Sequence, residues 1–168
     1  MTTKSKDRAL SSFPRFVLVM SVMFILAYAS SAAAEIKRLK GQTVYVPAYS
    51  HIYYGDREQP FYLTVTLSLR NTDPVNPITL VSIEYFDSEG KLLRKYLESE
   101  VKLGAMASTR YVVKETDKGG GSGANFLVRW KSEAKVTEPM IEAIMISTSS
   151  QQGISFSSRG QAVAENHE

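Results

Sequence analysis

The sequence contains no cysteine in its 168 residues. The chain therefore has no disulfide to stabilise its fold, no thiolate to bind zinc, and no thiol to accept a lipid after an export signal. Histidine is almost as scarce, with only His51 and His167. Because general bases are most often histidines, these absences leave few ways to assemble a catalytic or metal site. We expect no cofactor and no bound metal.

The first 34 residues differ in composition from the rest of the chain. Four basic residues precede an apolar run, FVLVMSVMFILAYA, and the small residues SSAAA follow it. This order of basic, apolar and small residues is typical of a secretory signal peptide. We predict a signal helix over residues 1–34, cleavage after Ala34, and export to the periplasm or the medium. An uncleaved signal that anchors the chain in the inner membrane is the alternative.

The remaining chain has no surplus of positive charge. The formal net charge of +3 is fully accounted for by the four basic and one acidic residues of 1–34. Residues 35–168 contain 16 basic and 16 acidic residues. Binding to nucleic acid or to an anionic membrane surface needs basic residues clustered on the fold, so we expect neither partner for the cleaved chain.

Period-two alternation dominates the sequence after residue 41. In FYLTVTLSLRN, Leu63, Val65, Leu67 and Leu69 alternate with hydroxyl and charged side chains. Successive side chains of a strand point to opposite faces, so this segment predicts a strand with one buried face. Further strands are predicted in ITLVSIEYF, KLLRKYL, VKL, STRYVVKE, NFLVRWK and GISFSS.

Two of these segments carry more detailed expectations. In ITLVSIEYF, Val81, Ile83 and Tyr85 are expected to share one face. Gly90 in the following DSEGK can adopt the positive φ of a tight hairpin. In EPMIEAIMIST, the β-branched residues favour a strand over about 141–148. A short helix at 138–148 is the alternative.

The segment TVYVPAYSHIYYGD, residues 43–56, is unusual because it is rich in tyrosine and interrupted by Pro47. Proline has no N–H to donate to a ladder, so the segment predicts a kinked edge strand. Beyond the kink, Tyr49, His51 and Tyr53 would share one face. Tyrosines with accessible hydroxyls suit contact with a protein or a sugar, although tyrosine is also commonly half-buried. The candidate contact surface is Tyr45, Tyr49, His51, Tyr53 and Tyr54.

Seven to nine short strands separated by turn residues, with no long helical pattern, predict an all-β fold. We expect an immunoglobulin-like antiparallel β-sandwich preceded by the N-terminal signal helix. The predicted organisation is a signal peptide at 1–34, a short leader at 35–41, a β-sandwich domain at 42–163 and a disordered tail at 164–168. The chain after the signal is long enough for one self-supporting core.

The glycine run GGGSG raises the question of a phosphate cradle. Such cradles open a helix, whose N-terminus binds the anion, and a nucleotide loop adds a lysine and a hydroxyl. Here the run leads into the predicted strand NFLVRWK, which favours a flexible hairpin connection. Its loop candidates for contact are Gly119, Gly121, Gly123 and Asn125.

Catalytic and metal-binding patterns are weak. A serine hydrolase needs a histidine base oriented by a carboxylate, and only His51, near Asp56 and Glu58, is placed in a predicted strand. No sharp strand-to-helix nucleophile turn is visible, so we assign no catalytic residue. His51 with Asp56 is too small a ligand set for a metal, and Met140 and Met145 would point to opposite faces of a strand.

Several motifs occur together in a recognisable order. They are GQTVYVPAYSHIYYGD, LTVTLSLRNTD, SIEYFDSEGKLLRKYL, GSGANFLVRW, IEAIMIST and QGISFSSRGQA. Together they resemble a bacterial family of small exported proteins catalogued only as a domain of unknown function, over about residues 41–163. The resemblance implies export and an immunoglobulin-like β fold, and it supplies no catalytic residue.

Three hypotheses of function follow. The first is a non-catalytic periplasmic or cell-envelope binding module that contacts an envelope protein or a glycan. The second is an enzyme that acts on envelope polymers with His51 as base. The third is a structural subunit that assembles by pairing of its edge strand with a neighbouring copy.

Overall fold

The computed structural model describes residues 36–148 and 153–165. The predicted signal peptide at 1–34 lies outside these residues. The described part contains strands and loops and no helix, and all its strand pairs are antiparallel. Accordingly, no described helix is long and apolar enough to span a membrane. The all-β prediction is confirmed.

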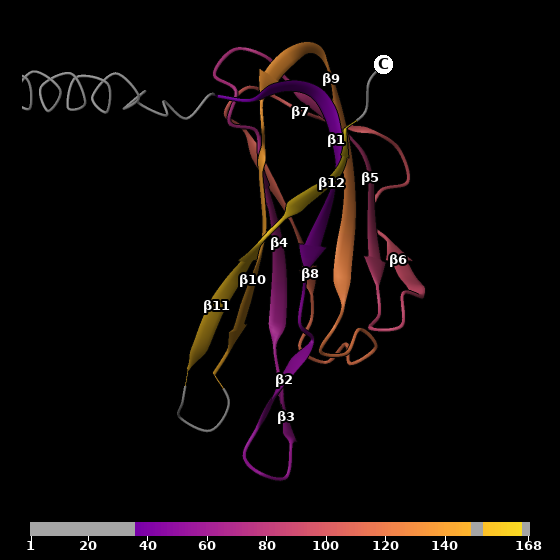
Figure 1. Ribbon diagram of the computed structural model, residues 1–168, viewed down its shortest axis with the longest axis vertical. Helices are drawn as coiled ribbons and strands as arrows, with labels where there is room; N and C mark the ends of the chain where they lie inside the picture. Colours follow the sequence, from indigo (N-terminus) through magenta and orange to yellow (C-terminus); the bar gives the residue numbers. More distant parts are fainter. Residues whose placement is uncertain (1–35, 149–152, 166–168) are drawn as a thin grey trace, which may run out of the picture. The chain divides into compact units, whose positions relative to one another are not determined.

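The larger of two main sheets has six strands (Figure 1). They are β1 (Arg38–Pro47), β5 (Ile78–Phe86), β6 (Leu92–Lys95), β7 (Val101–Leu103), β9 (Asn125–Thr137) and β12 (Gln161–Glu165). Their order is β12-β1-β9-β5-β6, and β7 pairs with the other half of β5. The segment 43–56 is therefore not one edge strand, because β1 lies between β9 and β12 at residues 42–45.

The smaller sheet has four strands in the order β11-β10-β4-β8. They are β4 (Thr64–Arg70), β8 (Ser108–Val113), β10 (Met140–Ser147) and β11 (Ile154–Arg159). The predicted strand over about 141–148 is thus confirmed, and the helical alternative is wrong. The two sheets pack as a sandwich-like pair, with apolar side chains of both forming one core.

The core follows the period-two pattern of the sequence. Val65, Leu67 and Leu69 of β4 and Phe126, Val128 and Trp130 of β9 are all fully buried. Burying each large apolar side chain contributes about 1.5–3 kcal/mol, so these alternating positions supply much of the driving force for folding.

A β-bulge alters the pattern in β5. Leu80 pairs with Trp130 and Ser82 with Arg129, so Val81 is the extra residue between two consecutive positions of β9. Ile83 and Tyr85 are buried as expected, whereas Val81 is only half-buried. The expectation that Val81 shares their face is wrong, because a bulge shifts the alternation by one residue.

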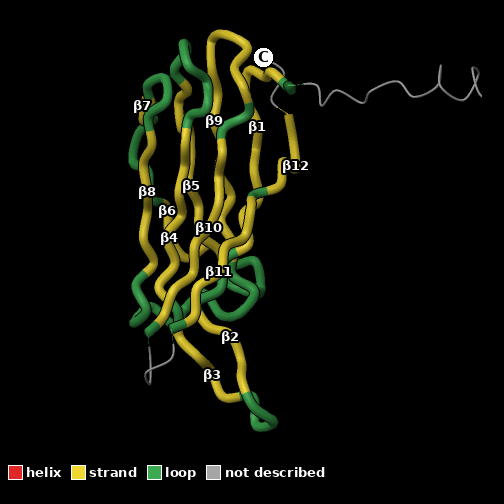
Figure 2. Tube along the Cα trace, turned by 90° about the vertical axis from the view of Figure 1, so that its left-hand side faces the viewer, coloured by secondary structure: helices red, strands yellow, loops and turns green. Residues whose placement is uncertain are grey.

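Beyond Pro47 the chain forms a separate hairpin, β2 (His51–Tyr54) and β3 (Gln59–Tyr62), which is a two-stranded sheet of its own. It extends from one end of the two main sheets (Figure 2). Its turn contains Gly55 and Glu58, both with positive φ, and the Glu58 N–H donates to the Gly55 carbonyl. Pro47 is the last residue of β1, where a missing N–H costs little.

One strand segment changes sheets at Gly160. β11 pairs with β10 in the smaller sheet, and β12 pairs with β1 in the larger one. At the corner, the Gly160 N–H donates to the Ile141 carbonyl at 2.8 Å. A Cβ on Gly160 would lie 2.7 Å from Val44 Cγ1 and 2.9 Å from the Ile141 oxygen, so the corner has no room for a side chain. This segment closes one lateral side of the sandwich.

The element boundaries differ from the prediction at both ends of the domain. β1 begins at Arg38, inside the predicted leader of 35–41, and β12 includes Ala164 and Glu165 of the predicted disordered tail. Residues 166–168 lie outside the described part. The described residues form twelve strands rather than seven to nine, since β2, β3 and β12 were not separated in the sequence pattern.

The NTDPVNP loop is a structural polar cluster between β4 and β5. Buried Asp73 accepts hydrogen bonds from the N–H groups of Val75, Asn76 and Thr137 at 2.8 to 3.1 Å. These bonds, that of Asn76 first, lower the pKa of Asp73 from 3.8 to about 2. Buried Asn71 donates to the Gly104 carbonyl at 2.8 Å, which ties the loop to the β7–β8 connection.

Candidate functional site

The glycine run lies in the connection between β8 of the smaller sheet and β9 of the larger one, at the end of the sandwich that carries the hairpin (Figure 1). It therefore joins two sheets and is not a hairpin turn. Ser88 fixes it from the β5–β6 turn: its N–H and hydroxyl donate to the Gly120 carbonyl, and its Oγ accepts from the Gly123 N–H. The Ser50 N–H donates to the Gly121 carbonyl at 3.0 Å.

Packing explains why glycine is needed here. A Cβ on Gly120 would lie 2.0 Å from Tyr85 Oη and 2.6 Å from Ser50 Oγ. Gly121 has a φ of +81°, a conformation that side chains disfavour. Of the predicted loop candidates, Gly119 donates to Asp117 Oδ1, and Gly123 to Ser88. Asn125 is half-buried at the start of β9, paired with Pro47 and Phe86.

Beneath this loop, Tyr85 Oη and Ser50 Oγ lie 2.9 Å apart and form a buried hydrogen bond. Tyr85 is fully buried, and burial raises the pKa of its phenol. The pair satisfies two hydroxyls inside the core, because an unpartnered buried hydroxyl would be costly. It is a structural contact, with the glycine loop packed directly on it.

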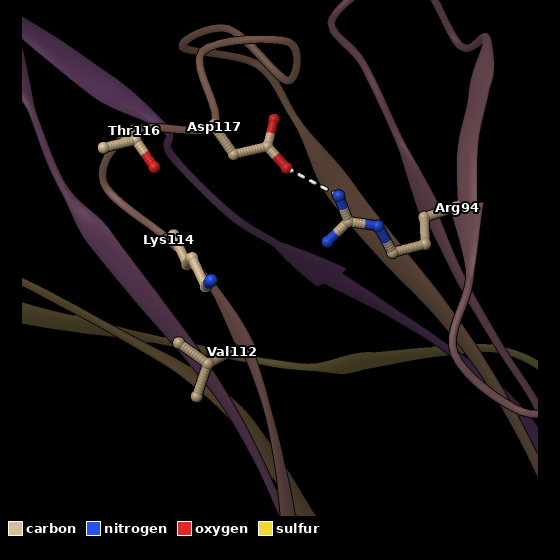
Figure 3. A pocket seen from close by; sticks show the side chains of 5 residues that line it. All are labelled: Arg94, Val112, Lys114, Thr116 and Asp117. Carbon is tan, nitrogen blue, oxygen red and sulfur yellow. Dashed lines mark hydrogen bonds and ion pairs between the residues drawn. The ribbon is translucent and has the colours of Figure 1, made fainter.

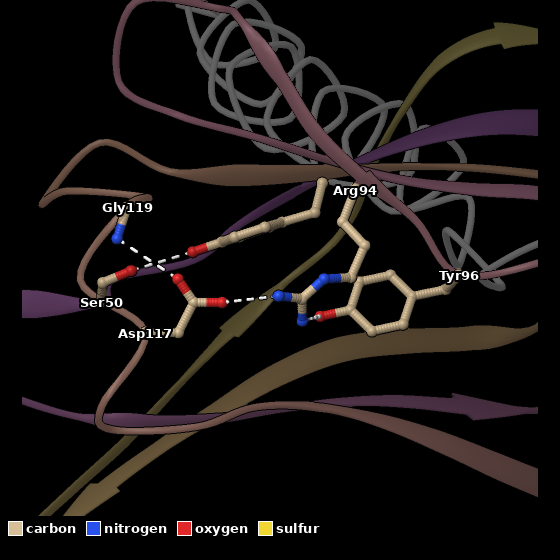
Figure 4. Close-up of polar contacts among 6 residues, drawn as sticks. Ser50, Arg94, Tyr96, Asp117 and Gly119 are labelled. Atoms are coloured by element: carbon tan, nitrogen blue, oxygen red, sulfur yellow. Dashed lines mark hydrogen bonds and ion pairs between the residues drawn. The ribbon is translucent and has the colours of Figure 1, made fainter.

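Arg94 of β6 forms an ion pair across to the same loop (Figure 4). Its Nη2 donates to Asp117 Oδ2 at 2.9 Å, and its Nη1 lies 3.4 Å from Tyr96 Oη. The Tyr96 phenol, followed by Asp117, raises the pKa of Arg94, so its guanidinium stays charged. Burial raises the pKa of the Tyr96 phenol, which remains protonated at neutral pH.

A pocket of about 330 Å³ lies beside this ion pair (Figure 3). Its walls come from β6, through Arg94, and from β8 and the loop after it, through Val112, Lys114, Thr116 and Asp117. Two cationic groups thus face one carboxylate, a hydroxyl and the methyl groups of an exposed valine. Such a pocket can accept a carboxylate or another small anionic group.

The hairpin carries an aromatic cluster on one face. His51 Nε2 lies 3.0 Å from Tyr53 Oη, and the two rings meet edge to face at 5.0 Å. Tyr62, directly opposite His51, packs against it at 5.8 Å. Lys118 Nζ lies 4.2 Å from the Tyr62 ring centroid, a cation–π contact that links the hairpin to the glycine loop.

The other face of the hairpin anchors it. Ile52 and Phe61 are directly opposite each other and pack against the core, and Tyr54 contacts Phe61 edge to face at 6.2 Å. Tyr53 and Tyr54 remain 54% and 57% exposed. The hairpin therefore presents one exposed tyrosine on each face while its base is held by apolar contacts.

The predicted tyrosine surface is divided by the structure. His51 and Tyr53 share a face, as expected. Tyr49 does not join them: it precedes β2 and is half-buried against Phe156 of β11 at 5.7 Å. Tyr45 lies in β1 of the large sheet, 37% exposed.

The contacts of His51 bear on its predicted chemistry. Within the described residues, its polar partner is the Tyr53 hydroxyl, and its buried Nδ1 has none. No group of three metal-ligating carboxylates or histidines occurs in that same part of the chain.

Arg94, Lys114, Thr116 and Asp117, which line the pocket, were not singled out by the sequence. The polar run KETDK directly before the glycines was a usable signal for three of them. No feature of the sequence pointed to Arg94, because it lies in a strand whose side chains are all exposed and which therefore has no buried face to orient it.

Together these features define a class: an antiparallel β domain of two packed sheets with a projecting aromatic hairpin and a charged pocket at one end. A family model described as "Protein of unknown function (DUF3124)" matches residues 41–163, and the chain belongs to this family. None of the curated proteins compared with the chain matches it. A solved structure titled "Crystal Structure of Thermotoga maritima 1070" is similar at 10% identity and a TM-score of 0.44, over 74% of this chain and 97% of that one.

Proposed function

We propose that the chain is an exported, non-catalytic binding module whose contact surface is the β2–β3 hairpin. The partner is an envelope protein or a glycan. The immunoglobulin-like form of the sandwich belongs to this proposal, which is supported by the two packed antiparallel sheets and the buried Trp130.

The exposure of Tyr53 and Tyr54 on an anchored hairpin carries the proposal. A tyrosine ring that is exposed to water in the free protein gains apolar burial in a complex, and its hydroxyl can bond to a partner. Because Ile52 and Phe61 already hold the hairpin against the core, little ordering is needed on binding, and this favours affinity.

Export is proposed from residues 1–34, whose basic, apolar and small segments follow the order of a signal peptide. The intact mass of protein recovered from the periplasm tests it. We expect the mass of a chain whose first residue is Glu35. Full-length protein retained in the cytoplasm would contradict export.

The absence of catalysis is proposed from the contacts of His51. Its Nε2 is bonded to the Tyr53 hydroxyl, whereas the buried hydroxyl of Ser50 is bonded to Tyr85. A histidine base acting on serine would need these two side chains in contact. Turnover of purified envelope polymers that is lost in His51→Ala would contradict this part of the proposal.

Site-specific photocrosslinking tests the hairpin surface. A photoreactive phenylalanine analogue is placed at Tyr53, at Tyr54 or, as a control on the body of the sandwich, at Tyr45, and cells are irradiated with the protein in place. We expect one crosslinked species from both hairpin positions and none from Tyr45. In the Tyr54→Ala variant the crosslink from position 53 should be lost, with a melting temperature lowered only by the loss of the Tyr54–Phe61 ring contact. Equal crosslinking at all three positions, or none, would overturn the hairpin assignment.

A further inference from the structure

The strand β8 has a free edge. It pairs with β4 on one side, and it is the last strand of the smaller sheet. In the side view it lies with β6 and β7 at the lateral side opposite β12 (Figure 2). A free edge offers unpaired N–H and C=O groups, which an added strand can satisfy.

The exposed side chains along this edge include two basic ones, Arg110 in β8 and Lys114 directly after it. Ser108, Arg110, Val112 and Lys114 alternate with inward-facing residues and are all exposed. Within the described residues, Arg110 and Lys114 form no ion pair. The pocket with Arg94 begins at Val112 and Lys114, so a third cation lies beside the same end of the strand.

This charge pattern indicates which kind of strand could pair with the free edge of β8. Two copies of β8 paired antiparallel about Arg110 or about Val112 would place Arg110 opposite Arg110 or opposite Lys114, and like charges directly opposite destabilise a strand pair. Pairing about Tyr111 would place Arg110 opposite Val112 and Lys114 opposite Ser108, which avoids the repulsion but gives neither cation a carboxylate. A second copy of this chain is therefore a poorer match than an acidic strand. A strand with acidic side chains at every second position would instead face Arg110 and Lys114 with opposite charge.

We propose that the free edge of β8 accepts an extended acidic segment of a partner protein as an additional strand. Main-chain hydrogen bonds to β8 supply the pairing. Alternate carboxylates bind Arg110 and Lys114, with one reaching the pocket beside Arg94. This surface is separate from the hairpin.

A peptide of about seven residues, with alternating glutamate and valine, blocked ends and a fluorophore, is the probe. Binding to the full chain is followed by fluorescence anisotropy, and amide hydrogen exchange locates it. We expect saturable binding that slows exchange in β8. The Lys114→Glu variant should weaken binding about tenfold or more, since reversing a contact charge replaces attraction by repulsion.

Three controls separate strand pairing from general charge attraction. Lys135→Glu makes the same charge change on an exposed residue of β9 and should leave affinity unchanged. A peptide methylated on alternate amide nitrogens keeps its charge, cannot pair, and should not bind. Tyr53→Ala should have no effect, because the hairpin is a separate surface.

The outcomes are decisive in both directions. Absence of binding, equal weakening by Lys114→Glu and Lys135→Glu, binding of the methylated peptide, or exchange protection away from β8 would each overturn the proposal. Loss of the hairpin crosslinks described above would leave it standing.

Discussion

The two lateral sides of the sandwich are closed by different means. On one side the chain itself passes from sheet to sheet, since β11 continues through Gly160 into β12. On the other side β8 and the strands β6 and β7 belong to different sheets, and no described strand pairs with both. The chain crosses on this side too, in the connection between β7 and β8, but that connection is a loop and not a continuous strand segment. Side chains supply a further contact, since the rings of Tyr96 and Tyr111 meet at 5.4 Å.

On the first side, which we call the closed side, β11 and β12 also end their sheets, each pairing with one strand only, but the chain joins them directly at Gly160. On the second side, the open side, side-chain contacts bridge the sheets, and β8 ends its sheet with Arg110 and Lys114 exposed. Free main-chain edges therefore occur on both sides, and its charge is what distinguishes the edge of β8 as a site for an acidic strand.

The largest expected effect is on the closed side, at Gly160→Ala. The added Cβ would lie within 3.1 Å of Val44 Cγ1, Val46 Cγ2 and the Ile141 oxygen, and a main-chain oxygen in a ladder has little room to move. Overpacking of this kind costs about 1–3 kcal/mol. Urea unfolding measures it. Gly153→Ala is the matched control, because nothing lies within 4 Å of its Cβ position.

The polar cluster at the end of the open side should give the next largest effect. Asp73→Ala leaves the N–H groups of Val75, Asn76 and Thr137 without their acceptor. Because several partly buried hydrogen bonds lose one shared acceptor, we expect a clear drop in the urea midpoint at pH 7.

Asp73 also predicts a pH dependence. Its pKa is lowered from 3.8 to about 2 in the folded protein, so the unfolded state takes up the proton first as the pH falls. The contribution of Asp73 is therefore fully present above about pH 4 and is lost as the pH falls towards 2. Asp73→Ala should lack this part of the acid dependence. The check is the free energy of unfolding of both proteins, measured between pH 5 and pH 2. If it falls by the same amount in Asp73→Ala as in the unchanged protein, the prediction is wrong.

Much of this fold was predictable from the sequence, and the parts that were not have physical reasons. Alternation located β4, β5, β8 and β9 because each buries one face. β12 escaped notice because QAVAE is rich in alanine and polar residues, and its strand form depends on pairing with β1. The bulge at Val81 likewise exists only in relation to β9.

The candidate sites were less predictable than the fold. The tyrosine-rich segment was predicted as a kinked edge strand, and the hairpin of β2 and β3 was not foreseen. A single sequence also does not show that Tyr49 turns towards Phe156 while Tyr53 stays exposed. The pocket unites Arg94 with residues 112–117, and these belong to different sheets. Strand periodicity indicates which face is buried and leaves open which edges become neighbours.

A smaller effect is expected for the aromatic contact on the open side. A double-mutant cycle with Tyr96→Ala and Tyr111→Ala should give a coupling energy of about 0.5–1.5 kcal/mol, the usual range for an edge-to-face pair. Tyr96 also contacts Phe126, so the single variant will lose more than the coupling alone. Additive single effects in urea unfolding would show that the two rings do not bridge the sheets.

The smallest effect is expected for the ion pair between Arg94 and Asp117. Its side chains are 48% and 26% exposed, so water and salt screen the attraction, and exposed pairs contribute at most about 1 kcal/mol. Asp117→Asn should lower stability slightly at low salt and hardly at all at 1 M salt, where the screening length is about 3 Å. The same change frees Arg94 from its carboxylate and should strengthen binding of the glutamate–valine peptide while leaving stability nearly unchanged. If peptide affinity fell instead, Asp117 would have to hold Arg94 in its binding position, and the open side would then depend on this ion pair for its shape rather than on the tyrosine contact.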